Sequence, residues 1–545
     1  MKAVLIDGYI DEPATLGVPP YISPYIRYVY GALLLKGFNV VYRTIDAIRN
    51  EDTWEFDSEY IIIYGGTTVP GHYLSGTPIL LSEVRKIVSK NPHSKIFVGG
   101  PLAKAYTIKG GSKAIIPEFE GAITVTGDIW AFFYNFPDSN PDEKDSYDMV
   151  NKISIAGAEI LKNHPNFPNV LCEMEVSRGC ERSSFCSFCT EPLLHGRLRS
   201  RDVEGIVREV EALCKNGCRA YRLGRSANII AYMADKNDGL PSPQALLDLY
   251  SGIREVCPEL EVLHTDNANP SYITKYERET RKIIETIVKY NTAGDVLSFG
   301  AESFDEAVLR KNNIGSYPEE VRRAIETVNE IGGIRENGVP KLLPGINLLY
   351  GLIGETKDTY EKNYTFLKKI LDDGLLLRRI NIRQVMVYPN TPLSRYYRLH
   401  KFKLDKKLFN YWKEKIRKDI DEPMIKRVFP KGAVIKGALP EKKKGNITFM
   451  RPLGTYPILI GTYSKVRGKS DMMVVAHGRR SVTAVKMPFD INKVSFEELL
   501  SIDGIGRSRA EEIIMKRPFK DVKYMKEMLD EETYKAMESL LEVNQ

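Results

Sequence analysis

The chain alternates apolar, strand-like runs with segments of helical spacing over most of its 545 residues, and this alternation constrains its fold most strongly. Strands that alternate with helices pack as a parallel sheet covered on both faces. We therefore predict a doubly wound, Rossmann-like α/β domain over residues 1–150. The glycine pairs Gly65–Gly66 and Gly99–Gly100 suit either the approach of a phosphate or cofactor tail, or a tight turn. The predicted strands are 2–9, 39–46, 60–66 and 95–101, and the helices are 25–37 and 78–92.

The same rhythm returns after a polar, proline-punctuated stretch at residues 140–168, which we interpret as a linker. Five or six strand–helix units then predict a partial or full (β/α) barrel over residues 165–400, with its chemistry at the carboxyl ends of the strands. Asp266 and Asn269 lie at such a strand end and are candidates for substrate contact, whereas His264 is expected in the core. The predicted strands lie near 219–224, 260–265, 296–301, 345–351 and 380–388.

Three of the seven cysteines fall within ten positions, in the stretch GCERSSFCSFC at residues 179–189. The chain begins as a strand rather than a signal peptide and has no apolar run of membrane-spanning length. We therefore expect a cytoplasmic protein with reduced thiols, so the grouped cysteines indicate a metal or catalytic site rather than disulfides. Three thiolates favour an iron–sulfur cluster with one iron open to a ligand, and a zinc site completed by His195 is the alternative.

With Cys180, Cys186 and Cys189 on one loop and Phe188 before the third cysteine, the sequence resembles the radical S-adenosylmethionine (SAM) enzymes. The resemblance implies that the cysteines bind a [4Fe–4S] cluster and that SAM chelates its fourth iron. It also implies that Phe188 packs by the adenine and that a 5′-deoxyadenosyl radical abstracts a substrate hydrogen. The family usually spaces these cysteines Cys-x3-Cys-x2-Cys, so the first gap is longer here. We expect Glu181–Phe185 to form a bulged loop over the cluster, with the three sulfurs converging.

Later segments extend the resemblance along the barrel. The stretch 222–239 lacks the family's Gly-Gly-Glu element but resembles the methylthiotransferase branch, which implies a cofactor-binding position for Gly224. The stretch 297–313 resembles a strand-end element in which Glu302 and Ser303 approach SAM. Two more segments resemble family turns: GINLLYGLIGET (345–356) and VYPNTPLS (387–394).

The N-terminal domain resembles two domains that precede such barrels. One is the cobalamin-binding domain of methylating radical SAM enzymes, but its Asp-x-His-x-x-Gly pattern is absent, so cobalamin would bind without a protein ligand. The other is the methylthiotransferase domain that holds a second cluster. Residues 1–171 contain no cysteine, which disfavours sulfur insertion. Cys214 and Cys218 are interpreted as buried structural thiols, with Cys257 remote from them.

Positive charge is concentrated near the C-terminus. Residues 401–490 hold 22 Lys and Arg against 8 Asp and Glu, whereas the other 455 residues sum to −7. We interpret residues 401–488 as a basic segment with a small antiparallel β module at 456–488, in the position of the RNA-binding TRAM domain of methylthiotransferases. The basic belt favours a polyanionic partner, and a solvated lysine-rich helix is the alternative.

Residues 489–545 are predicted to be helical, and the stretch 491–519 resembles a helix–hairpin–helix motif. In such a motif the free amides at the N-terminus of the second helix face a phosphate of the nucleic acid. A hairpin used for packing or protein contacts is the alternative. The nucleic-acid-binding candidates are Gly504, Gly506, Arg507 and Arg509.

The domain order resembles a largely archaeal group of radical SAM enzymes that end in a helix–hairpin–helix. We expect an enzyme with a [4Fe–4S] cluster and SAM that takes electrons from a reducing donor and modifies a nucleic acid, RNA rather than DNA. Two alternatives remain open. One is a cobalamin-dependent methylation of a small molecule or peptide, and the other is a non-catalytic nucleic-acid-binding protein with a structural metal site. The sequence assigns no catalytic residue.

Overall fold

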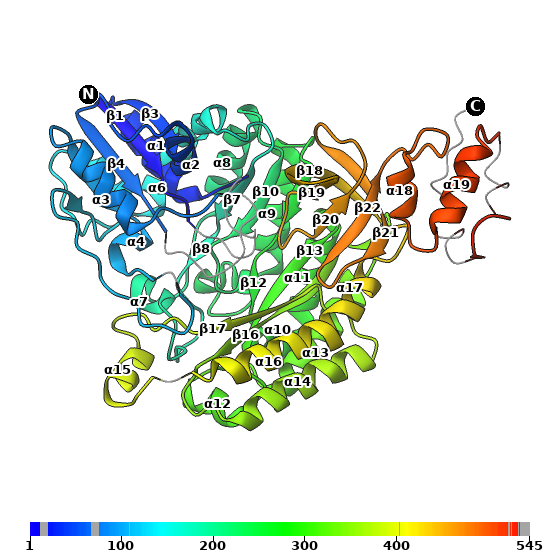
Figure 1. The fold of residues 1–545 in the computed structure, drawn as a ribbon. Coiled ribbons are helices and arrows are strands. Elements are labelled where there is room, and N and C mark those ends of the chain that lie inside the picture. Colours follow the sequence, from blue (N-terminus) through cyan, green and yellow to red (C-terminus); the bar gives the residue numbers. More distant parts are fainter. Residues whose placement is uncertain are drawn as a thin grey trace.

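The computed structural model describes residues 1–10, 20–66, 76–107, 109–402, 404–520, 524, 526–531 and 534. These residues form an N-terminal parallel sheet, a large half-barrel and a small closed barrel (Figure 1). None of the helices in the described ranges is both long and apolar enough to cross a bilayer. The predicted α/β class is confirmed.

The N-terminal domain is a five-stranded parallel sheet in the order β3-β1-β4-β5-β6. Its strand order reverses between β1 and β4, and ligands of doubly wound sheets bind at such a switch, beyond the carboxyl ends. The segments that follow these two strands, 11–19 and 67–75, lie outside the described residues. The strands are β1 (Lys2–Asp7), β3 (Asn39–Thr44), β4 (Tyr60–Tyr64), β5 (Lys95–Gly99) and β6 (Ile123–Thr124), and the helices are α1 (Pro24–Leu35), α2 (Ile45–Glu51), α3 (Leu81–Lys90), α4 (Pro101–Lys104) and α5 (Ile129–Asn135).

The first glycine of each predicted pair is a packing position. A Cβ at Gly65 would lie 2.9 Å from side-chain atoms of both Ile79 and Leu102, and one at Gly99 would lie 2.7 Å from Ile129. Both glycines therefore let neighbouring segments approach the strand ends.

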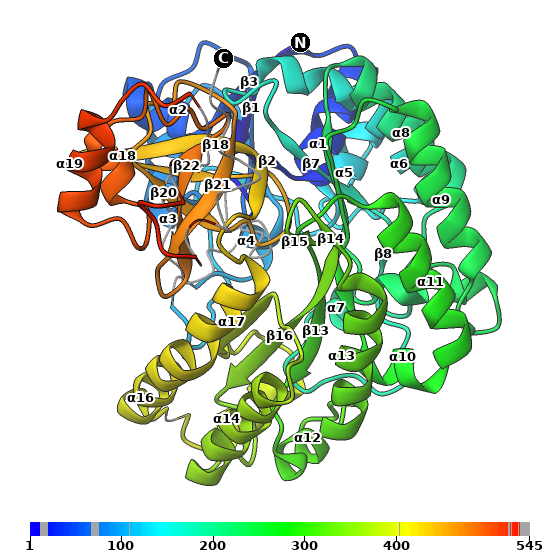
Figure 2. The same cartoon turned by 90° about the vertical axis from the view of Figure 1, so that its right-hand side faces the viewer.

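The half-barrel consists of two sheets, in the orders β11-β10-β7-β2 and β12-β13-β16-β17, with all neighbouring strands parallel. The five predicted strands are present, and an unpredicted strand from the N-terminal segment, β2 (Tyr21–Ile22), pairs with β7. Figure 2 shows α9, α11 and α13 along the outer side of the strands. The other strands are β7 (Leu171–Glu175), β10 (Ala220–Gly224), β11 (Val262–His264), β12 (Asn267–Ala268), β13 (Asp295–Glu302), β16 (Leu342–Tyr350) and β17 (Arg379–Gln384), and the main helices are α8 (Val203–Lys215), α9 (Pro243–Val256), α11 (Glu277–Tyr290), α13 (Pro318–Gly332) and α14 (Lys357–Asp372).

The predicted linker at 140–168 is wrong for most of its length. The chain forms the helix α6 (Tyr147–Ala156) and a 3-10 helix (Gly157–Asn163), and Val150 and Ile153 are fully buried. A Cβ on Gly157 would clash with the backbone of α1. The segment is polar on average, so the sequence did not reveal its narrow apolar face. This face packs against α1 and α8.

A buried ion network joins the N-terminal domain to the half-barrel. Arg27 of α1 lies 2.7 Å from Glu209 of α8, and Arg201 pairs with the other oxygen of the same carboxylate. All three side chains have no exposed surface. Burial alone would raise the pKa of Glu209, but the two guanidiniums outweigh burial and lower it.

The small C-terminal barrel is closed, in the order β18-β19-β20-β22-β21. It is larger than the predicted module, and it is not wholly antiparallel, because β20 and β22 pair in parallel. Its loop between β19 and β20 enters the half-barrel, where the Thr455 amide donates to His264 Nδ1 at 2.8 Å. The strands are β18 (Val434–Lys444), β19 (Ile447–Arg451), β20 (Leu459–Thr462), β21 (Ser470–His477) and β22 (Ser481–Lys486), preceded by α15 (Pro392–Leu399), α16 (Lys406–Ile416), a π-helical turn η5 (Arg417–Asp421) and α17 (Glu422–Val428), and followed by α18 (Phe496–Leu500) and α19 (Arg507–Met515).

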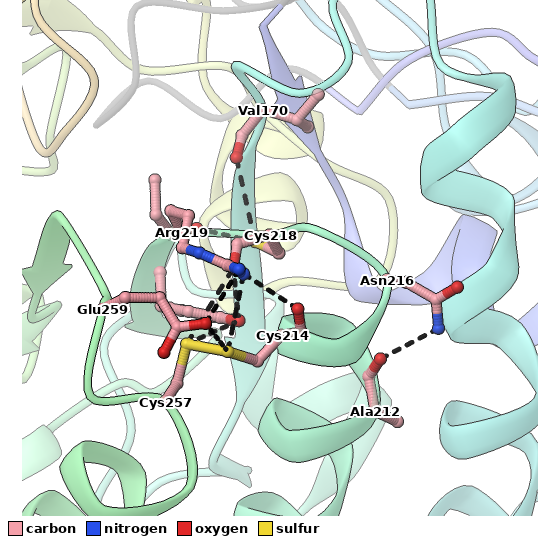
Figure 3. The surroundings of a disulfide bond; sticks show 10 residues. Val170, Ala212, Cys214, Asn216, Cys218, Arg219, Cys257 and Glu259 are labelled. Atoms are coloured by element: carbon pink, nitrogen blue, oxygen red, sulfur yellow. Dashed lines mark hydrogen bonds and ion pairs between the residues drawn. A yellow bond between two sulfur atoms is a disulfide. The ribbon is translucent and has the colours of Figure 1, made fainter.

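A disulfide joins Cys214 to Cys257 (Figure 3). It overturns two predictions, namely that Cys214 is a buried free thiol and that Cys257 lies remote from it. Cys214 lies near the end of α8 and Cys257 caps the C-terminus of α9, and their Cα atoms are 5.9 Å apart. The two cysteines are far apart in the sequence, so their proximity was not predicted. In the fold, consecutive helices of a barrel lie side by side, and this brings their C-terminal ends together. The other five cysteines are free thiols.

We predict that removing this disulfide destabilises the protein. The double variant Cys214→Ala/Cys257→Ala should lower the free energy of unfolding by about 2–4 kcal/mol, because the crosslink restricts the unfolded chain. Urea unfolding measures the difference, with Cys218→Ala as a control that leaves the crosslink intact. Recovery of alkylated Cys214 and Cys257 from the untreated native chain would contradict the prediction.

We also predict a pH-dependent contribution from Asp7 at the end of β1. Burial raises the pKa of this carboxyl from 3.8 to about 6, although hydrogen bonds from Tyr42 and the Tyr9 amide oppose the shift. The native state therefore binds the proton more tightly, and its stability falls as the pH rises between these two values. Urea unfolding should show Asp7→Asn gaining about 1–3 kcal/mol relative to the wild type between about pH 3 and pH 8. A difference that is equal at both pH values would contradict this account.

Candidate active site

A cavity of about 440 Å³ lies at the carboxyl ends of the half-barrel strands, and all three grouped cysteines line it. Phe188 contributes to the same wall, and Glu302 from the end of β13 and Arg383 from β17 also line the cavity. The structure thus brings six residues from three distant stretches of sequence to one site. Parallel strands place their carboxyl ends at one edge of a barrel, which explains this convergence.

The cysteine loop is fixed by backbone hydrogen bonds at both ends. The Cys180 carbonyl accepts from the Leu198 amide at 3.0 Å, and the Ser187 amide donates to the Asn312 carbonyl at 2.9 Å. The Cys189 amide donates to the Cys186 carbonyl at 3.2 Å, which closes a turn between these two cysteines. The longer first gap is therefore accommodated by an irregular loop that is held in place.

Burial raises the pKa of Cys180 and of Cys189 to about 12. Burial also raises the pKa of Cys186, although the guanidinium of Arg182, 3.0 Å from its sulfur, opposes the shift. Without a metal the three groups are therefore neutral thiols at neutral pH. A metal that binds them must displace their protons.

The donor set fits an iron–sulfur cluster better than a single metal ion. Thiolates are the soft ligands that iron–sulfur clusters take. A tetrahedral zinc would hold its sulfurs roughly 3.8 Å apart. The three cavity cysteines do not hold their sulfurs within 4.8 Å of one another. Among the described residues, the His, Cys, Asp or Glu side chains that form so compact a trio are Cys214, Cys257 and Glu259. His195 does not complete a compact site with them, so the zinc alternative does not fit.

Glu302 points to the cavity from a strained backbone position. Its φ is 61°, in the left-handed region, where a bulge interrupts the pairing of β13 with β16. Burial raises the pKa of its carboxyl to about 7, and Arg383 opposes the shift. Strained backbone of this kind is common at functional sites. At neutral pH this carboxyl is poised between its two protonation states.

Two of the proposed cofactor residues lie elsewhere. Ser303 is buried and faces α14, with its hydroxyl 3.4 Å from Asn363 Oδ1 and accepting from the Asp305 amide at 3.1 Å. Ser303 follows Glu302, whose backbone is left-handed at the bulge, and this turns the Ser303 side chain away from the cavity. Gly224 also does not line it, because the side chains of Glu173 and Arg222 fill the space beside its Cα. Neither residue lines the cavity, and a cofactor contact by either one stays a prediction.

The site contains a carboxylate that sequence reasoning did not assign. Glu181, in the lengthened gap, lines the cavity and accepts hydrogen bonds at 3.0 Å from the amides of Asn228 and Asn269. Its other oxygen lies 3.6 Å from the sulfur of Cys180. The longer first gap between the cysteines was the available signal. Glu181 directly follows Cys180, so the sequence could have predicted that its carboxylate lies at the site.

The other strand-end candidates divide between the cavity and the core. Asp266 and Asn269 line the cavity, and Asp266 also pairs with Arg222. His264 is buried, as expected. Glu355 closes a turn by accepting from the Gly351 amide at 2.7 Å, so it serves the local backbone rather than the cavity.

The candidate nucleic-acid hairpin lies far from the cavity, since Figure 1 places α19 and α7 (Glu191–His195) at opposite sides of the molecule. Gly504 has a φ of 96°, and Gly506 caps the N-terminus of α19. Arg507 pairs with Glu511 at 3.0 Å, and Arg509 donates to the Gly504 carbonyl at 2.7 Å. Most of the segment predicted to follow α19 lies outside the described residues.

Comparisons with known proteins point to one family. The model of the Radical SAM superfamily matches residues 174–367. An uncharacterized protein of Methanocaldococcus jannaschii is 40% identical over 517 residues, which cover 90% of this chain and 94% of the relative. The ribosomal protein uS12 methylthiotransferase RimO of Dictyoglomus thermophilum is 28% identical over 38% of this chain and 42% of its own length. A tRNA-2-methylthio-N(6)-dimethylallyladenosine synthase of Azobacteroides pseudotrichonymphae is 26% identical over 41% of this chain and 44% of its own length.

We predict that each cavity cysteine is needed to bind iron. Cys180→Ala, Cys186→Ala and Cys189→Ala should each lose most of the about four irons per chain gained on anaerobic reconstitution, because a cluster needs all its thiolate ligands. Cys218→Ala is the matched control, because Cys218 is buried outside the cavity. Iron content and visible absorbance measure the result. Full iron loading of any of the three cavity variants would remove that cysteine from the site.

Proposed function

This chain belongs to the radical SAM superfamily, and we propose that it modifies a nucleic acid, RNA rather than DNA. As a member it is an enzyme whose cofactors are a [4Fe–4S] cluster and SAM. When bound, these supply the one-electron chemistry that abstracts a hydrogen atom from a substrate. The observation that carries the assignment to this site is that three free thiols and Glu302 line the same cavity.

In this proposal, some residues of the cavity bind the cluster and others contact the cofactor or the polar groups of the substrate. Cys180, Cys186 and Cys189 hold the cluster, and Phe188 packs beside the cofactor. Glu302 with its pKa near 7 and Arg383 give the cavity a carboxyl and a guanidinium that can bind polar groups or exchange a proton at neutral pH.

Surface charge supports a nucleic-acid substrate. Lys442, Lys443 and Lys444 are exposed at the end of β18, on the small barrel that also reaches into the half-barrel. The hairpin before α19 adds a further candidate contact, and one similar relative is by name a synthase that acts on a tRNA adenosine. Phosphate contacts of this kind give affinity without sequence choice.

Cobalamin-dependent methylation is a second candidate, because the switch point of the N-terminal sheet lies near the cavity. Arg225 lines the cavity and lies over the ring of Tyr25 at 5.1 Å, and Tyr25 lies 6.4 Å from Tyr64 at the end of β4. A cofactor held at that sheet edge would therefore be adjacent to the radical site. Retention of cobalamin by the purified full chain after dialysis, measured by absorbance, would favour this candidate.

We predict that the reconstituted protein cleaves SAM. With a reductant it should yield 5′-deoxyadenosine and hold about four irons and four sulfides per chain. Zinc in place of iron, with no deoxyadenosine, would contradict the enzyme assignment. Nucleoside analysis of tRNA and rRNA from a deletion strain then tests the substrate class, and an unchanged nucleoside profile would contradict an RNA substrate.

The surface assignment makes a separate prediction. The double variant Lys442→Glu/Lys444→Glu should weaken binding of unmodified tRNA several-fold and lower the salt dependence, because each lost phosphate contact removes about one unit of the slope. Lys282→Glu, an exposed position on α11, is the control. Equal weakening in both variants would show a general charge effect and contradict a role for this surface.

A further inference from the structure

Four arginines gather where the half-barrel, η5 and the small barrel meet. Arg378 and Arg379 lie at the start of β17, Arg417 begins η5, and Arg480 precedes β22. Among the described residues, the carboxylate that pairs with this group is Asp421, which contacts Arg417 and lies 3.8 Å from Arg480. Figure 2 shows α16 and α17 running up to the small barrel at this junction. Four cations therefore share one anion.

Arg379 has the least compensated charge of the group. Its Nε donates to Asn381 Oδ1 at 2.7 Å, and its guanidinium lies over the ring of Tyr456 at 4.8 Å. No carboxylate pairs with it in the part of the chain that the structure describes. Burial lowers its pKa well below the ordinary value, and repulsion from Arg480, Arg417 and Arg378 lowers it further. Arg379 is half-buried, and a partly desolvated charge that no carboxylate neutralises favours binding of a counter-ion.

A fifth cation, Lys413, lies close enough to Arg417 and Arg480 for their charges to repel it. Burial lowers the pKa of Lys413 on α16, and the nearby guanidiniums of Arg417 and Arg480 lower it further. Glu414 beside it is exposed and lies 3.6 Å from Arg479 instead. Glu414 on α16 therefore does not neutralise the arginine group, and the group keeps a net positive charge.

The cationic group adjoins the reactive cavity through two hydrogen-bonded side chains. Tyr456, from the loop of the small barrel, lines the cavity and holds its hydroxyl 2.8 Å from Asn381 Nδ2. Asn381 also donates to Asn347 Oδ1 at 2.7 Å, and Asn347 lines the cavity. Arg379 is thus one residue layer from the cavity wall.

We propose that Arg379, Arg417, Arg480 and Lys413 form a binding site for a phosphate-class anion. Guanidinium groups match phosphate oxygens with paired N–H donors. An anion that binds between several cations also offsets the repulsion among them. Resting on the proposed function, the anion is a backbone phosphate next to the nucleotide that enters the cavity. The small barrel then supplies both the cavity residue Tyr456 and the phosphate contact Arg480.

Titration of inorganic phosphate into the full-length wild-type chain tests the site by calorimetry. We expect saturable binding that Arg480→Gln weakens about tenfold, since charge-assisted contacts are lost. Arg479→Gln is the matched control, because its side chain is 66% exposed and is directed to Glu414. Circular dichroism checks the fold of each variant, and Lys413→Gln serves as the second variant. No binding to the wild type, or equal affinity in Arg480→Gln and Arg479→Gln, would overturn the site.

A 5′-phosphorylated oligoribonucleotide distinguishes the two sources of phosphate. If Arg480→Gln weakens both phosphate and oligonucleotide binding, the site holds a backbone phosphate, as proposed. If it weakens phosphate binding alone, the anion site stands but takes free phosphate, and its link to the proposed function is overturned. If the wild type binds the oligonucleotide but not phosphate, the nucleic-acid function survives and the anion site fails.

Discussion

The pairing of Glu209 with Arg27 and Arg201 fixes how the N-terminal domain meets the half-barrel. Arg27 also donates to the Glu173 carbonyl at 2.7 Å, so one guanidinium connects α1, α8 and the first barrel strand. Removing Glu209 would leave two buried guanidiniums without their carboxylate, at a cost of about 3–5 kcal/mol. Because this network docks α1 on the barrel, the carboxyl edge of the N-terminal sheet lies beside the wall that carries Arg225 and the cysteine loop.

The periodic part of this architecture was readable from sequence, and the irregular part was not. Strand–helix alternation predicted the parallel sheet and the half-barrel, because burial on both faces leaves a continuous apolar signal. The linker prediction failed at Val150 and Ile153, whose apolar face is short and set among polar residues. The sequence placed Cys257 far from Cys214, although the packing of α8 against α9 brings the ends of these helices together.

The candidate site shows the same division at the level of single residues. Spacing alone located Cys180, Cys186 and Cys189 in the chain, and the structure places all three at one cavity. It did not reveal that Ser303 turns toward α14, because a left-handed bulge residue reverses the side of the next one. Nor did it reveal Tyr456, which reaches the cavity from a separate domain through a loop with no periodic pattern.

The central claim is that three thiols of one cavity hold a cluster whose remaining iron is open to SAM. Electron paramagnetic resonance of the anaerobically reconstituted and reduced chain tests this most directly. The account predicts a [4Fe–4S]⁺ signal that changes when SAM is added and that is absent from Cys189→Ala. A signal that SAM leaves unchanged would mean that no iron of the cluster is open, and it would contradict the account.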